Sequence, residues 1–159
     1  MGQILIGTQG WNYDTWSGSF YPKATRAPDY LRVYARAFRT VEVDSTFYGV
    51  PPAATVEHWA ERVPDGFLFA PKMPQAITHQ RRLRDAEDVL DAFAARVRLL
   101  GRNLGPVLIQ LGPEFGPDRR ASLERFLPRL PSDIRFAVEF RRPEWLEPSL
   151  LRLLADHRV

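Results

Sequence analysis

The sequence predicts an α/β fold of the TIM-type (β/α) barrel class, in which 159 residues supply about five of the eight βα units. Five short apolar runs alternate with helix-like stretches, and strands buried on both faces of a parallel sheet have this continuous apolar character. Every run ends in a polar residue, whereas a doubly wound sheet concentrates its function at one switch point. The turn at residues 7–11 also lacks a Gly-rich phosphate fingerprint and contains Trp11. A five-strand flavodoxin-like doubly wound sheet, which would be complete at this length, is the alternative.

The predicted strands recur along the chain with polar residues at their ends. They cover residues 4–6, 41–43, 67–70, 107–109 and 136–138. In α/β folds the chemistry sits at the carboxyl ends of the strands, and those ends share one edge of the sheet. We therefore expect the polar residues there to gather in one place: Glu42, Asp44, Lys72, Gln110 and Glu139.

Amphipathic stretches between the strands predict five helices. In the clearest of them, apolar residues recur at i+3 and i+4 up to Gly101, which is a natural helix stop. Pro28 opens the first helix. The predicted helices cover residues 28–38, 53–62, 85–101, 118–130 and 147–157. The aromatic, Gly-punctuated stretch at 11–21 is predicted to be a functional loop over the sheet end.

Composition and charge narrow the class of protein. The chain has no cysteine, which excludes a disulfide framework and thiolate chemistry, and its 45% hydrophobic content indicates a real core. No apolar stretch approaches the roughly 18 residues of a membrane span, and the amino terminus lacks a signal-peptide pattern. We therefore expect a cytoplasmic protein without a membrane partner. The net charge is only +3, so the sequence gives weak support to nucleic-acid binding.

Strand alternation selects the residues that can carry chemistry. If Val41 and Val43 face the helices, the residues between and after them face the barrel axis. The same parity gives one inward-facing polar set: Glu42, Asp44, Lys72, Gln110, Glu139 and Arg141. A buried carboxylate is costly without a partner, so Glu42 is either neutralised by Lys72 or kept for function. Glu42, Lys72 and Glu139 are the predicted catalytic residues.

Lys72 is one of two lysines in a chain with twenty arginines, which indicates a site that needs a compact charge or a group able to lose its proton. Three roles stay open: a structural ion pair with Glu42 or Glu139, binding of an anionic ligand, and a titrating or Schiff-base lysine. Glu42 and Glu139 would suit the acid and base of a sugar-cleaving barrel. With Asp44 and His79 they would also suit a divalent metal, but no His-rich spacing supports this, so no metal or cofactor is assigned.

Aromatic side chains and one histidine complete the predicted ligand site. Trp11 and Tyr48 each lie close to a polar strand end and are predicted to stack on a sugar or a base. Phe20, Tyr21 and Phe47 are predicted to pack the loops together instead. His79 follows the third strand, where it would serve as a hydrogen-bonding anchor or as a catalyst. The predicted ligand-binding residues are Trp11, Asp44, Tyr48, His79, Gln110 and Arg141.

Five segments, in order, carry a family resemblance: 7–11 (GTQGW), 41–48 (VEVDSTFY), 72–79 (KMPQAITH), 104–111 (LGPVLIQL) and 138–145 (VEFRRPEW). Together they resemble the prokaryotic family known as domain of unknown function 72, also called YecE-like. The resemblance implies a TIM-type barrel of roughly 240 to 290 residues, in keeping with the usual size of such barrels. The chain lacks the family's later motifs, and it has Asp44 where the family commonly has asparagine.

These observations lead to one expectation for the whole chain. Residues 1–159 are expected to form a single domain, an incomplete barrel that ends before a sixth strand, and open strand edges would favour self-association. The expected function is an enzyme that acts on a small polar, sugar- or nucleotide-like ligand at the carboxyl ends of the strands. The alternative is a non-catalytic module that binds nucleic acid or a phosphorylated ligand.

Overall fold

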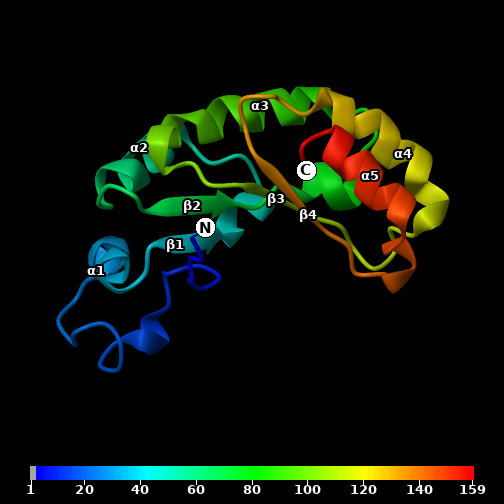
Figure 1. Ribbon diagram of the computed structural model, residues 1–159. Coiled ribbons are helices and arrows are strands. Elements are labelled where there is room, and N and C mark those ends of the chain that lie inside the picture. Colours follow the sequence, from blue (N-terminus) through cyan, green and yellow to red (C-terminus); the bar gives the residue numbers. More distant parts are fainter. Residues whose placement is uncertain (1–2) are drawn as a thin grey trace.

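The computed structural model describes residues 3–159 and contains four short strands and five α-helices in that range (Figure 1). The strands are β1 (Thr40–Val43), β2 (Leu68–Pro71), β3 (Val107–Gln110) and β4 (Phe136–Glu139). The helices are α1 (Tyr30–Ala37), α2 (Ala53–Glu61), α3 (Glu87–Val97), α4 (Arg120–Phe126) and α5 (Pro148–Asp156). Each strand is thus followed by a helix, as the alternation of patterns predicted.

The strands form two parallel two-stranded sheets, β1 with β2 and β3 with β4. Isolated bridges at Phe69–Leu104 and Lys72–Leu108 connect β2 to the β3 region. A further bridge joins Gln9 to Glu42. Neighbouring strands therefore follow chain order, and their carboxyl ends point the same way.

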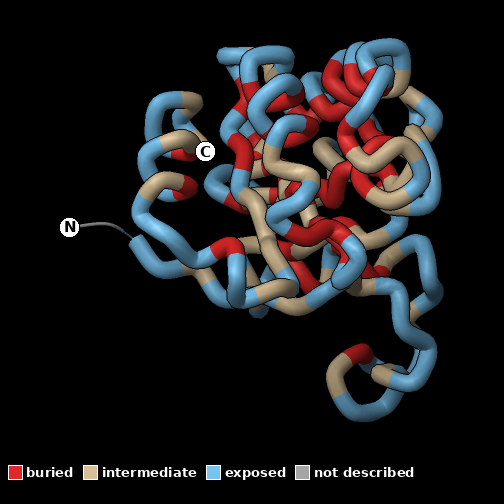
Figure 2. The backbone as a smooth tube through the Cα atoms, turned by 90° about the vertical axis from the view of Figure 1, so that its right-hand side faces the viewer, coloured by how far each residue is buried: buried red, intermediate tan, exposed pale blue. Residues whose placement is uncertain are grey.

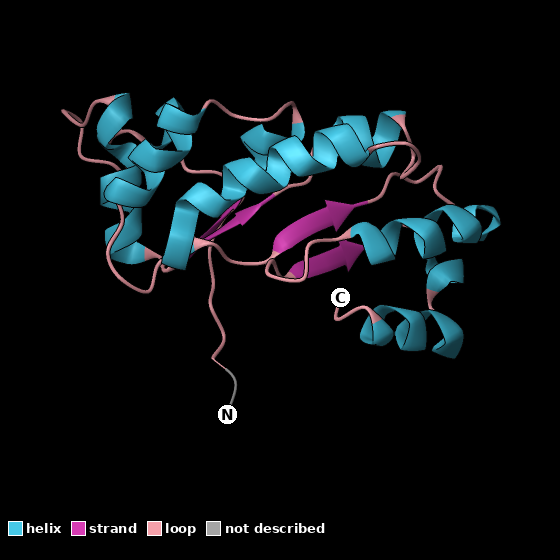
Figure 3. Cartoon of the chain, turned by 90° about the horizontal axis from the view of Figure 1, so that it is seen from above, coloured by secondary structure: helices cyan, strands magenta, loops and turns pink. Residues whose placement is uncertain are grey.

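The prediction of a TIM-type barrel with five βα units is wrong, because no closed barrel forms within residues 3–159. The predicted first strand at residues 4–6 is not a strand, and Ile4 and Ile6 are 87% and 74% exposed. Figure 3 shows this segment running away from the helices. Closure requires every strand to have two neighbours, and four strands of four residues each cannot provide this. The flavodoxin-like alternative is also wrong, because chain-order pairing differs from a 2-1-3-4-5 sheet.

The predicted helices are confirmed, with small shifts at their ends. The third begins two residues later than predicted and passes into a 3₁₀-helix, Arg98–Asn103, where Gly101 has a positive φ of 53°. A π-helix at Ala76–Gln80, after β2, was not predicted. None of the helices in residues 3–159 has both the length and the apolar character needed to cross a membrane.

One face of the strands is packed against helices, and the other is more open. Along β1 and β2 buried residues alternate with partly exposed ones, and Val41, Val43 and Phe69 are at most 1% exposed. Figure 2 shows the buried residues gathered toward the inside of the tube and the exposed ones on its outer turns. Two apolar clusters result, one around β1, β2 and α1 and the other around β3, β4 and α3 to α5, and Leu104 packs against both. The open face therefore carries the polar residues that alternate with this core.

The loop between residues 11 and 21 packs its rings together, as predicted for Phe20 and Tyr21. Tyr21 is 1% exposed and stacks on Tyr30 at 4.1 Å with an interplanar angle of 5°. Phe20 contacts the Tyr34 ring edge-on at 6.3 Å. These contacts attach the loop to α1 and so fix the position of the turn that precedes it.

Candidate functional site

Lys72 is the centre of a polar cluster at the carboxyl ends of the strands. Its side chain is 7% exposed, and its Nζ lies 2.9 Å from Oδ1 of Asp44 and 3.8 Å from Oε1 of Glu42. The ammonium also lies 5.1 Å from the centre of the Phe47 ring, a favourable position for a cation–π interaction. The buried charge is thus compensated by two carboxylates and one ring.

The chain after β1 builds this arrangement through one short 3₁₀-helix, Asp44–Phe47. Thr46 within it is 1% exposed, and its hydroxyl lies 2.8 Å from the Val43 carbonyl oxygen and 2.7 Å from the Lys72 carbonyl oxygen. The backbone N–H of Lys72 donates to the Val43 carbonyl at 3.2 Å. Thr46 therefore ties the ends of β1 and β2 together and fixes the carboxylate of Asp44 beside the ammonium of Lys72.

The carboxylates around Lys72 differ in their protonation tendencies. Partial burial raises the pKa of Glu42 and outweighs the lowering effect of Lys72, while the negative charges of Asp44 and Glu139 raise it further. Burial also opposes ionisation of Asp44, but interactions with Lys72 and Gln9 bring its pKa below the ordinary value. The surroundings thus shift the pKa values of these two neighbouring carboxyl groups in opposite directions, so Glu42 holds its proton more readily than Asp44 does.

A second part of the cluster lies on β3 and β4. Gln110 and Glu139 are register partners, and the Gln110 amide donates to both carboxylate oxygens of Glu139 at 2.9 Å. The Arg141 guanidinium donates to the same carboxylate at 3.2 Å. Burial alone would raise the pKa of Glu139, but the hydrogen bonds from Gln110 and Arg141, with the charges of Arg141 and Lys72, lower it. Glu139 is therefore held ionised.

His79 lies on the π-helix that follows β2. Its Nδ1 is 2.9 Å from the Thr78 hydroxyl, and its ring meets the Phe47 ring edge-on at 5.0 Å. Burial lowers the pKa of His79, with further lowering from Arg141 and Lys72 against an opposing effect of Glu114. Phe47, predicted only to pack loops together, thus contacts both the imidazole and the ammonium.

The segment after His79 carries backbone strain. Arg82, Leu83 and Asp85 have positive φ angles of 52°, 63° and 47°, a conformation that disfavours residues with a Cβ. Leu83 is only 4% exposed, so core packing holds the strained segment in place. Both π-helices and strained segments concentrate at functional sites. No signal in the sequence marked this strain, because none of the three residues is a glycine.

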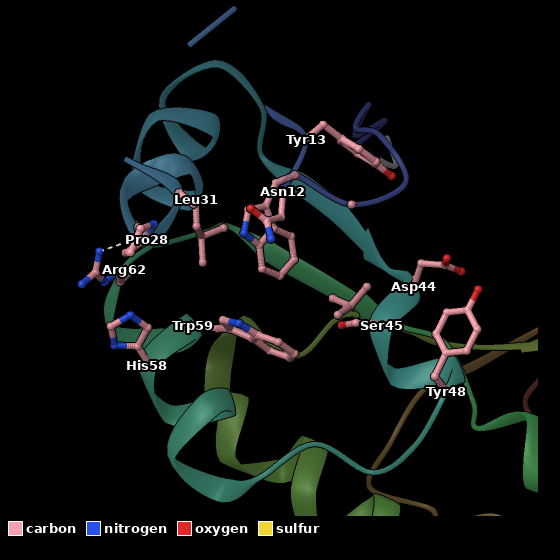
Figure 4. Close-up of a pocket in the computed structure, with 14 residues that line it drawn as sticks. Asn12, Tyr13, Pro28, Leu31, Asp44, Ser45, Tyr48, His58, Trp59 and Arg62 are labelled. Carbon is pink, nitrogen blue, oxygen red and sulfur yellow. Dashed lines mark hydrogen bonds between the residues drawn. The ribbon is translucent and has the colours of Figure 1, made fainter. Parts of the chain in front are cut away.

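The structure brings most of the predicted site residues together and leaves Trp11 apart. Glu42, Asp44, Lys72, Gln110, Glu139, Arg141 and His79 influence one another through hydrogen bonds or charge. Trp11 packs edge-on against Trp59 at 5.5 Å and Phe69 at 6.1 Å, on the helix side of the strands. Tyr48 is 72% exposed. Trp11 and Tyr48 line a cavity between α1 and α2, and Asp44 belongs both to the lining of this cavity and to the polar cluster around Lys72 (Figure 4).

Sequence reasoning did not select Thr46 or Trp59 as site residues. Thr46 belongs to the same motif as Asp44, and a threonine in the turn after a strand is a detectable signal of a side chain that bonds backbone carbonyls. Trp59 lies on the second helix, where its aromatic character is equally typical of the core. Across residues 3–159, no group of three or more His, Asp or Glu side chains is arranged to hold a metal ion.

Comparisons with known proteins identify relatives of the chain. A family model described as "Protein of unknown function DUF72" matches residues 5–159. The UPF0759 protein YecE of Escherichia coli K12 is 33% identical over 142 residues, which cover 89% of this chain and 50% of YecE. The UPF0759 protein YunF of Bacillus subtilis 168 is 33% identical over 153 residues, covering 91% and 53% of the two chains. The chain thus spans about half the length of the curated relatives it matches.

Solved structures with a similar fold belong to the same family. The crystal structure of a DUF72 family protein from Thermotoga maritima superposes with a TM-score of 0.85 at 25% identity, over 99% of this chain and 63% of that one. A DUF72 family protein from Enterococcus faecalis gives a TM-score of 0.68 at 26% identity, over 80% of this chain and 55% of that one. The fold described above is therefore similar to part of each of these structures.

Proposed function

The chain belongs to the DUF72 family of proteins of unknown function, and from that premise we propose that it is an enzyme acting on a small polar, sugar- or nucleotide-like ligand at the carboxyl ends of its strands. The observation that carries the proposal is the buried Lys72 between carboxyl groups of opposite protonation tendency. Environments that push the pKa values of neighbouring titratable groups apart are typical of acid and base pairs.

Each of the three charged groups has a chemical role in this proposal. Glu42, whose pKa is raised, serves as the proton donor. Glu139, whose pKa is lowered, serves as the proton acceptor or as a ligand for substrate hydroxyl groups. The Lys72 ammonium stabilises negative charge that develops on the substrate, because a fixed cation in a partly dry site is worth more than one in water.

The arrangement supports an ion-paired role for Lys72 over that of a Schiff-base lysine. A nucleophilic amine must lose its proton, and proximity to cations or apolar burial favours that loss. Here the Nζ donates to a carboxylate oxygen of Asp44 at 2.9 Å and lies 3.8 Å from one of Glu42, so the side chain is already engaged in ion pairs. Arg141 donates to the Glu139 carboxylate and His79 packs edge-on against Phe47, and both complete the proposed binding surface for a polar ligand.

Turnover assays with two substrate panels test the proposal. The purified chain is incubated with p-nitrophenyl glycosides and, separately, with nucleoside mono- and triphosphates, and release of nitrophenol or phosphate is measured. Glu42→Gln should lower any observed rate by about 10²–10⁴-fold, the usual contribution of a general acid. Glu124→Gln, which changes an exposed ion pair with Arg120 on α4, is the matched control and should keep the rate.

Two results would count against the proposal. Equal rates for the wild-type chain and Glu42→Gln would remove Glu42 from the chemistry. No turnover in either panel, together with DNA binding that weakens steeply with salt, would favour the non-catalytic binding module instead.

A further inference from the structure

A cavity of about 610 Å³ lies on the helix side of the strands, between α1, α2 and the turn at residues 10–13 (Figure 4). This volume falls in the range of about 300–1,000 Å³ that is usual for small-molecule sites. Neither Lys72 nor Glu139 lines it, and Asp44 is the group that it shares with the charged pair at Lys72. The cavity is therefore a separate place from the proposed catalytic cluster.

Aromatic and aliphatic side chains form the body of the cavity. Trp11 and Trp59 meet edge to face, with ring centres 5.5 Å apart and an interplanar angle of 88°. Trp59 is backed by Phe69, whose ring lies 6.2 Å away at an angle of 28°. Figure 4 shows Trp59 across one side of the cavity and Leu31 on the other. Since both tryptophans are held by packing, they offer a ligand a preformed apolar surface.

The polar groups of the cavity lining include an amide, a hydroxyl and a carboxylate, which provide hydrogen bonds and add no positive charge. Asn12 and Ser45 are exposed and line it, so an amide and a hydroxyl are available. The Asp44 carboxylate contributes an acceptor, and its lowered pKa keeps it ionised near neutral pH. Asn12 and Ser45 come from two loops to this apolar surface, while the Asp44 carboxylate lies at the rim of the cavity, turned toward Lys72 (Figure 4). An apolar surface with a few polar groups at its edge is the usual composition of a small-molecule site.

The single arginine of the cavity lining is already paired. Arg62 donates to the Pro28 carbonyl oxygen at 2.6 Å and lies 3.2 Å from a carboxylate oxygen of Asp29. No lysine is part of the lining. The lining thus offers a phosphate or carboxylate ligand no lysine and only an arginine that is already ion-paired, and Asp44, itself paired with Lys72, adds no positive charge, so the cavity favours an uncharged ligand.

We propose that this cavity binds the ring of a neutral carbohydrate. The apolar face of the sugar packs on Trp59 and Trp11, and its hydroxyl groups donate to Asp44 and exchange hydrogen bonds with Asn12 and Ser45. A ring with several hydroxyl donors matches a carboxylate acceptor beside an aromatic surface, because it supplies the donors that the carboxylate needs and the apolar face that the rings need. This binding does not depend on catalysis at Lys72.

Titrations of the whole chain test the assignment. Glucose, xylose, N-acetylglucosamine and cellobiose are added at millimolar concentrations, and ¹H–¹⁵N spectra follow the indole N–H signals of Trp11 and Trp59. At least one sugar should give saturable shifts confined to the cavity. Trp59→Ala should weaken binding by at least about tenfold, and Trp59→Phe should recover part of it. Asn12→Ala should weaken binding about three- to tenfold, consistent with the loss of one hydrogen bond.

The controls separate this proposal from its rivals and from the proposed function. Asn12 is exposed, so its variant keeps the test valid if Trp59→Ala fails to fold. Glu42→Gln should retain sugar binding even if it abolishes turnover, so failure of the catalytic proposal leaves this one standing. The proposal is overturned if no sugar shifts the two indole signals, if adenosine binds more tightly than every sugar, or if AMP binds more tightly than adenosine.

Discussion

Replacing Lys72 by methionine tests the electrostatic description of the site most directly. Methionine keeps an unbranched side chain of similar length, so packing against Phe47 is largely retained while the charge is lost. The variant leaves Glu42 and Asp44 side by side without their shared cation. Since Lys72 lowers the pKa of Glu42, Asp44 and Glu139 in the native protein, all three pKa values should rise. The pKa of His79 should rise as well, because the same cation lowers it.

The size of the stability change in Lys72→Met follows from how far the side chains of the ion pairs are buried. Breaking a fully buried ion pair by removing one partner costs about 3–5 kcal/mol, and an exposed pair contributes about 0–1 kcal/mol. Here the lysine side chain is 7% exposed while the side chains of Glu42 and Asp44 are 32% and 30% exposed. An intermediate loss of about 1–3 kcal/mol in the free energy of unfolding at pH 7 is therefore expected. The loss should shrink at acid pH, where the stabilisation of carboxylates with lowered pKa values is lost in both proteins.

Urea unfolding at several pH values and NMR titration of ¹³C-labelled side-chain carboxyl groups measure these effects. Lys23→Met is the matched control, since Lys23 is the other lysine of the chain and is exposed, and its stability change should stay within about 0.5 kcal/mol. Asp44→Asn in the Lys72→Met background should recover part of the loss, because it removes one uncompensated carboxylate. Unchanged titration of Glu42 and Asp44 in Lys72→Met would refute the reasoning.

Three further changes probe the cluster and the strand contacts. Glu42→Gln should stabilise the fold at neutral pH, because the native structure opposes ionisation of Glu42 and a glutamine does not ionise. The raised pKa of Glu42 means that its protonated form stabilises the wild-type protein at low pH and that this stabilisation is lost as the pH rises through that pKa. Acid-unfolding series should therefore show that the advantage of the variant disappears below the ordinary glutamate pKa. Thr46→Val should lower the free energy of unfolding by about 1–2 kcal/mol, because buried carbonyl groups lose a donor; urea denaturation would contradict this if both proteins unfold alike. Gly105→Ala should lower the melting temperature, since the new Cβ would lie 2.7 Å from the Phe69 carbonyl oxygen, whereas Gly49→Ala, with nothing within 4 Å, should change it little. Equal melting temperatures would argue against the close strand contact.

The sequence predicted the individual strands and helices better than the way in which the strands pair. Apolar runs identify strands because a residue buried between a sheet and a helix must be apolar, and Val41, Phe69 and Ile109 behave in this way. The run at residues 4–6 has the same composition and is not a strand, because a strand forms only where a neighbouring backbone satisfies its hydrogen bonds. In the described part of this region, the backbone hydrogen bonds to β1 are those that Thr8 and Gly10 form with Glu42. Composition does not contain this information.

The sequence was sufficient to predict which charged residues of the strands share one side of the sheet, but not which of them pairs with Lys72. Strand parity placed Glu42, Gln110 and Glu139 on one side, because alternation is a geometric property of any strand. The nearest partner of Lys72 is Asp44 rather than Glu42, the partner that register alone suggested. That preference depends on the 3₁₀-helix at Asp44–Phe47, which turns the Asp44 carboxylate toward the ammonium. Loop conformations of this kind depend on tertiary contacts such as those of Thr46, which a single sequence does not reveal.

Two energetically unfavourable features, one at Glu42 and one in the segment that follows the π-helix of His79, stand out in the structure. Glu42 is a carboxyl group whose surroundings oppose ionisation, and the segment of Arg82, Leu83 and Asp85 holds three residues in a left-handed conformation. Strain of this kind costs about 1–3 kcal/mol per residue and persists only where packing over-determines it. A glutamine at position 42 and glycines in the loop would relieve both features. Under the proposed function, the raised pKa of Glu42 is the feature that a proton donor requires.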